Sequence, residues 1–89
     1  MARMDLQDAT FGDVTPHAAT ADMLFELGLM YCIGTTVEQD YVTAHKWFNL
    51  AAMKGSEDAR VYRCEISREM SAAQVHEAQK QARAWMTLH

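Results

Sequence analysis

The sequence has little proline, few cysteines and no long apolar run. It holds one proline among 89 residues, and about half of its residues are apolar, a composition typical of a compact helical protein. No stretch reaches the roughly eighteen continuous apolar residues of a membrane span. The first residues lack the apolar run of a secretory signal. We therefore predict a cytoplasmic protein without a membrane segment.

Two cysteines are too few for a disulfide framework. Neither Cys32 nor Cys64 belongs to a Cys-x-x-Cys pair. If their helices pack side by side, an axial offset of about 6 Å adds to the roughly 8–10 Å between helix axes. That separation exceeds the usual span of a disulfide. We expect two reduced, mostly buried thiols.

Basic residues are scarce in the first half of the chain. The net charge is −4 and no run of Lys or Arg occurs, which argues against a nucleic-acid partner. Residues 1–44 carry seven acidic residues against Arg3 alone, whereas residues 45–89 carry seven basic against five acidic residues. Either this asymmetry orients a partner or favours head-to-tail self-association, or it reflects solvated faces, which is the commoner case.

The spacings of metal and catalytic sites are missing too. The four histidines, His17, His45, His76 and His89, form no His-x-x-x-His or His-Glu-x-x-His pattern. His45 is expected to be half-exposed at the edge of a packed face. We predict no metal and no cofactor.

Side chains that resemble nucleophiles have structural explanations. Ser56 and Ser71 are explained as helix caps, and a thiolate is disfavoured within an apolar helix. Glu65 and Glu69 share a helix face, where we expect them to meet solvent and Arg68. No glycine-rich phosphate loop is found, and we predict that the chain is not an enzyme.

Cap and breaker residues divide the chain into four helices. Residues 1–14 have no clean period and form either an arm anchored by Phe11 or a disordered tail. The following segments are then expected: a helix from Thr15-Pro16 to Ile33, closed by Gly34; a helix over Tyr41 to Lys54, capped by Asp40; a helix from Ser56 through Met70; and a helix from Ala72 to about Leu88, opened by the capping box Ser71-Ala72-Ala73-Gln74.

The first two predicted helices each contain a small residue, Gly28 and Ala44, among large apolar ones. A glycine inside a helix costs about 1 kcal/mol relative to alanine, so Gly28 requires a reason, and close helix–helix approach supplies one. Ala44 would leave similar room, with Tyr31, Trp47 and Phe48 filling the space around it. The first helix is apolar on nearly every side beyond Met23. We expect it to be the central helix.

This spacing resembles the Sel-1-like repeat, a relative of the tetratricopeptide repeat, from about residue 23 to 59. Members of the family usually have a glycine at the position of Thr36 and a small residue at the position of Met23. These two departures concern the geometry of the turn and the start of the first helix. The matching positions are Leu27, Gly28, Tyr31, Gly34, Val37, Asp40, Ala44, Trp47, Ala51, Ala52, Gly55 and Ala59.

The second half is a degenerate version of the first. Arg63 and Cys64 stand where Leu27 and Gly28 would repeat, as expected of a capping unit. The stretch from Met70 is similar to C-terminal caps of bacterial Sel-1-like proteins. We predict an all-α fold of two stacked antiparallel hairpins, with an arm over 1–14 and one domain over 15–89 whose capping hairpin spans about 56–89.

The resemblance implies a small protein-interaction module that holds a protein or peptide. A homo-oligomeric or assembly subunit is the alternative, and a small enzyme or metal protein is the third. Trp85 is either part of the core, which we favour, or an anchor for a partner. The inner groove would be lined from the first helix of each pair. The residues expected to contact the partner are Glu26, Met30, Arg60, Arg63 and Ser67.

Overall fold

The computed structural model describes residues 18–87, which form four helices and, within that range, no strand. The helices are α2 (Ala21–Ile33), α3 (Tyr41–Met53), α4 (Glu57–Ser67) and α5 (Ala72–Thr87). The predicted all-α class with four helices is confirmed. The arm over residues 1–14 and the helix start at residues 15–16 lie outside the described residues.

The first described helix begins later than predicted. Thr20 is its N-cap: its backbone is extended and its Oγ1 accepts a hydrogen bond from the Met23 N–H at 3.1 Å. One continuous helix from Thr15 to Ile33 is therefore wrong, because the side chain of Thr20 competes with helical hydrogen bonding there.

The other predicted caps are confirmed. The side chains of Asp40 and Ser56 each accept a hydrogen bond from the backbone N–H three residues on. Ser71 and Gln74 form a reciprocal capping box. The Gln74 N–H donates to Ser71 Oγ at 3.1 Å, and the Ser71 N–H donates to Gln74 Oε1 at 2.8 Å.

The turn between α2 and α3 is fastened to the end of α2. Gly34 adopts a left-handed conformation with φ of 77°, and its N–H donates to Met30 O. The Asp40 N–H then donates to Tyr31 O at 3.0 Å, and Gln39 Nε2 donates to Cys32 O at 2.9 Å. These bonds satisfy carbonyl groups that a helix end leaves without partners.

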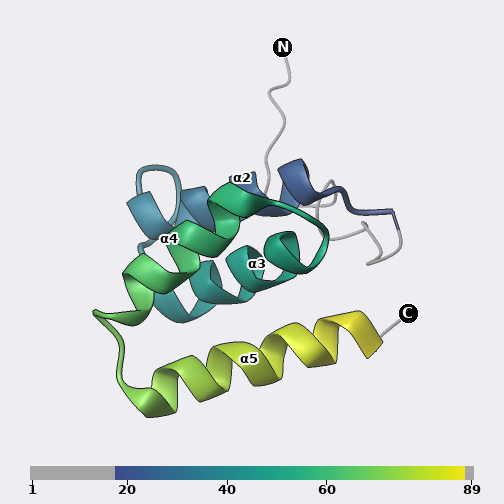
Figure 1. Cartoon of the computed structure of the whole chain (residues 1–89). Helices are drawn as coiled ribbons and strands as arrows, with labels where there is room; N and C mark the ends of the chain where they lie inside the picture. Colours follow the sequence, from purple (N-terminus) through teal and green to yellow (C-terminus); the bar gives the residue numbers. More distant parts are fainter. Residues whose placement is uncertain (1–17, 88–89) are drawn as a thin grey trace.

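The helix against which the other three pack is α3 (Figure 1). Helices α2 and α4 lie on it on one side and α5 lies along the opposite side, while α4 and α5 scarcely touch each other. Lys54, at the end of α3, donates from Nζ to the carbonyl of Ala19 before α2 at 2.6 Å, so the first pair is antiparallel. The expectation that the first helix is central is wrong.

The Gly28 position makes room for an aromatic ring. A Cβ placed there would overlap Cδ1 and Cε1 of Phe48, which is fully buried. The interpretation that Gly28 leaves room for the backbone of a neighbouring helix is wrong, because the atoms that occupy this space belong to the Phe48 side chain. Ala44, also fully buried, is the second small residue of this interface.

Helix α5 packs on α3 through small residues and one tryptophan. Ala78 and Ala82 are buried, and Val75 and Trp85 are half-buried. The Trp85 ring meets the Trp47 ring edge-on at a centroid distance of 5.3 Å. Trp85 thus packs against the core, as expected.

Candidate functional site

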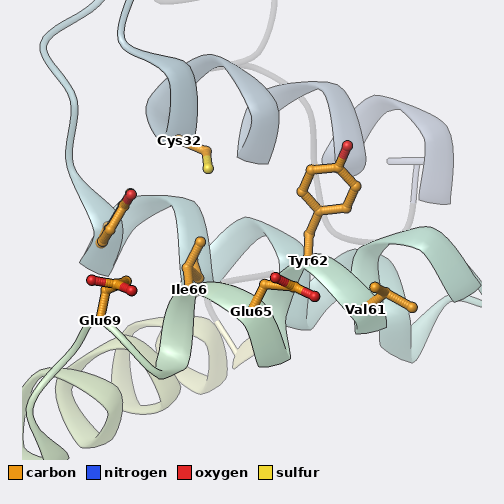
Figure 2. Close-up of a pocket in the computed structure, with 7 residues that line it drawn as sticks. Cys32, Val61, Tyr62, Glu65, Ile66 and Glu69 are labelled. Atoms are coloured by element: carbon orange, nitrogen blue, oxygen red, sulfur yellow. The ribbon is translucent and has the colours of Figure 1, made fainter.

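Helices α2 and α4 both rest on α3 but touch each other only marginally, which leaves a surface furrow of about 550 Å³ between them. We call it the α2/α4 furrow. Its volume lies within the range of ligand-binding clefts. Figure 2 shows Tyr62 and Ile66 directed from α4 toward α2, from which Cys32 points back. The lining residues are Cys32, Tyr41, Val61, Tyr62, Glu65, Ile66 and Glu69.

The floor of the furrow is an outward extension of the core. The Tyr62 ring lies edge-on to Phe25 with centroids 5.4 Å apart, and its centroid lies 5.4 Å from that of Phe48. Yet Tyr62 remains 41% exposed, and its neighbour Val61 is 56% exposed. Adjacent apolar groups that a fold leaves exposed, with polar residues around them, mark interaction sites, whereas single exposed apolar residues are ordinary.

Two carboxylates stand beside this apolar surface. Glu65 lies on α4 and Glu69 lies in the turn that follows it, so the expected shared helix face is not formed, but both are exposed and both line the furrow. Over residues 18–87 the one ion pair is Arg60 with Glu57, at 2.6 Å. The expected pairing with Arg68 is therefore not formed, and neither carboxylate is neutralised by a cation of the described chain.

The two cysteines differ in environment. Cys32 is half-buried and lines the furrow, and burial raises the pKa of its thiol, which favours the protonated form. Cys64 is exposed on the outer face of α4. Both are free, as expected. The prediction that both are mostly buried is wrong for Cys64, because none of the four helices within residues 18–87 covers that face.

A polar contact joins α3 to α4 on another flank of α4. His45 is 2% exposed, and its Nε2 lies 3.1 Å from Ser67 Oγ. Ser67 donates its hydroxyl proton to the Arg63 carbonyl at 2.7 Å, so Nε2 must be the donor to Ser67. The neutral ring then has its acceptor at Nδ1, which is buried and has no hydrogen-bond partner.

This environment disfavours a charged imidazole. Burial, with the positive charge of Arg63 as a second cause, lowers the pKa of His45. The Arg63 guanidinium itself donates to Asn49 Oδ1 on α3 at 2.7 Å. The expectation of a half-exposed His45 is wrong, because α4 covers the ring. Because Nε2 of His45 donates to Ser67, it cannot accept the hydroxyl proton of that serine as a general base would. We therefore interpret the His45–Ser67 pair as structural.

None of the five residues expected to contact a partner lines the furrow. Arg63 and Ser67 lie one helical turn apart and are hydrogen-bonded to α3, Arg63 to Asn49 and Ser67 to His45. Arg60 is exposed and paired with Glu57. Glu26 is exposed and Met30 packs on the core, and both lie away from the flank of α2 that faces α4, which Phe25 and Cys32 occupy.

A second hollow of about 500 Å³ lies where α3 and α5 end. Met53, at 64% exposed, and Met86, at 38%, supply its apolar surface, and Arg83 supplies a positive charge. Methionine side chains adapt readily to different partners.

Residues 18–87 contain no group of three or more His, Cys, Asp or Glu side chains placed to hold a metal ion. Over the same residues, every helix is too short or too polar to cross a membrane.

Residues 21–56 match the family model described as the Sel1 repeat. They form a Sel1 repeat. The match begins at the first residue of α2 and ends at Ser56, the N-cap of α4, and it covers less than half of the chain. No curated protein and no solved structure matches the chain.

The Sel1 repeat is a helical repeat of the tetratricopeptide type, and repeats of this kind act as protein-interaction modules. The predicted resemblance is thereby confirmed for the first helical pair. In this chain the Sel1 repeat supplies α2, α3 and the Cys32 and Tyr41 side of the furrow, whereas α4, which follows the repeat, supplies the other side.

Proposed function

We propose that this chain is a small protein-interaction module that holds a segment of a partner protein in the α2/α4 furrow, without catalysis. The observation that carries the proposal is the exposed apolar surface of Tyr62 and Val61, which continues from the core into a furrow between two helices. Burying such surface is the main driving force of association. The Sel1 repeat supports the same class of function.

This assignment moves the contact surface predicted from the sequence. Arg63 and Ser67 already hydrogen-bond within the protein, so a partner would have to break those bonds. Val61, Tyr62 and Glu65 lie on the adjacent flank of α4 and are exposed. We propose that they replace the predicted residues as the α4 side of the site.

A photocrosslinker tests the proposal. Benzoylphenylalanine replaces Val61 in one variant and Ala84, exposed on α5, in a control. In an extract of the native cells we expect one protein adduct at position 61, none at position 84, and loss of the adduct when Tyr41→Ala is added. Adducts of equal yield at both positions, or an adduct indifferent to Tyr41→Ala, would contradict the proposal.

Self-association is the second candidate, and the exposed pair Met53 and Met86 favours it. Light scattering over a range of concentrations would show a growing mass that Met53→Lys abolishes. A constant monomer mass would remove this candidate and leave the first untouched.

A further inference from the structure

The α2/α4 furrow carries negative charge from two glutamates, which restricts the kind of partner segment that it can bind. Its apolar floor is flanked by Glu65 and Glu69, and no ion pair of the described residues neutralises either carboxylate. An apolar segment without charge would cover the floor and leave two carboxylates partly desolvated, which is unfavourable. A segment carrying cations would cover the floor and also supply charged partners for the two carboxylates.

We infer that the occupant of the furrow is a protein segment in which lysine or arginine alternates with apolar side chains, the cations lying on Glu65 and Glu69 and the apolar groups on Tyr62 and Ile66. This rests on the proposed function and names the chemistry of the partner. Tyr41 and Tyr62 also line the furrow, and aromatic rings are favourable neighbours for cations.

The chain itself offers a poor occupant. Residues 1–17 carry three aspartates and Arg3 as their only basic residue, so their charge has the wrong sign for this furrow. A small polyamine would satisfy the carboxylates but would leave the exposed Tyr62 and Val61 uncovered. The combination of apolar floor and acidic rim thus favours a cationic, amphipathic protein segment.

Cys32 provides the readout. In Cys64→Ser, Cys32 is the only thiol, and it lies in the furrow. The rate at which it reacts with dithiobis(nitrobenzoate) therefore reports occupancy. The probes are three capped peptides of equal length in which leucine alternates with lysine, glutamine or glutamate, together with spermine.

We expect the lysine peptide to slow the reaction of Cys32, and the other three probes to bind about tenfold more weakly or not at all. Glu65→Gln with Glu69→Gln should weaken the lysine peptide about tenfold, since each exposed ion pair is worth up to about fivefold. Asp22→Asn with Glu77→Gln, which removes the same charge from exposed positions outside the furrow, should leave binding unchanged.

Three outcomes would overturn the inference. Equal protection by the glutamine peptide would show an apolar site without charge selection, and the proposed interaction function would survive. Equal protection by spermine would show a cation site that needs no protein segment. Slower reaction at higher protein concentration without any probe would show that a second copy of the chain fills the furrow. Failure of the proposed function itself is measured separately, by the adducts at positions 61 and 84.

Discussion

The ring of Phe48 lies where a side chain on residue 28 would have to stand. Two of its carbon atoms, Cδ1 and Cε1, would overlap a Cβ on Gly28. The ring is fully buried and also packs on Phe25 with centroids 5.8 Å apart. The α2–α3 pair is therefore held by a ring inserted into a notch, and the unfavourable helix propensity of glycine is offset by that contact.

Gly28→Ala should destabilise the protein by about 1–2 kcal/mol in urea unfolding. Overpacking costs about 1–3 kcal/mol, and the better helix propensity of alanine returns at most about 1 kcal/mol. In a background of Phe48→Leu the same substitution should cost less, because the smaller side chain vacates the notch. A gain in stability on Gly28→Ala would show that the ring moves aside freely.

Trp85→Ala should loosen α5 and spare the rest of the protein. The substitution removes the edge-on contact with Trp47 and half-buried apolar area, at a cost of about 2 kcal/mol. Hydrogen exchange should accelerate in α5 and much less in α2. Trp85→Phe keeps an aromatic ring and should cost roughly half as much; an equal cost for both variants would speak against the ring contact.

Stability should fall with acid because of His45. Its pKa in the folded protein is lowered by burial and by Arg63, whereas in the unfolded chain it stays near 6.5. Below that value the unfolded chain binds more protons than the folded one, so this contribution to stability is complete above about pH 6.5 and is lost as the pH falls.

Urea unfolding between pH 7 and pH 5 measures this effect. His45→Gln removes the titrating ring and keeps an amide donor for Ser67, so its stability should depend less on pH. The same substitution at His76, exposed on α5, is the matched control and should retain the wild-type dependence. If the two variants behave alike, His45 is not the group responsible.

Ser71→Ala should cost about 1 kcal/mol, the usual value for loss of an N-cap. The Gln74 N–H loses its acceptor, and the reciprocal bond from the Ser71 N–H to Gln74 can persist. Amide exchange should rise in the first turn of α5 alone. Ala73→Ser, exposed in the same turn, is a control that leaves both capping bonds in place.

Most of the fold followed from local chemistry. The caps Asp40, Ser56 and Ser71 were predictable because each satisfies backbone groups a few residues away. The notch at Gly28 was predictable because a glycine within a helix requires a reason. The start of α2 was missed, since Thr15-Pro16 and Thr20 both carry N-cap chemistry and the sequence does not rank them.

The furrow was missed because it depends on how three helices meet. Tyr62 and Ile66 have the spacing of core residues on α4, and nothing local shows that Tyr62 stays partly in water. The environment of His45 was also missed, since its burial arises from α4, twenty-two residues further along the chain at Ser67. The sequence signal nearest to the furrow is Glu65 and Glu69, two like charges four residues apart, but their expected contacts were solvent and Arg68 instead of a partner.

The arrangement in which α2, α4 and α5 each rest on α3, while α4 and α5 scarcely meet, makes tolerance to damage uneven along the chain. A destabilising substitution in α5 has a local effect, because α2 and α4 remain packed on α3. A destabilising substitution in α3 weakens the packing of all three other helices, because each of them rests on α3. Random mutagenesis should therefore recover viable changes densely in the last helix and sparsely between residues 44 and 51, whatever the partner turns out to be.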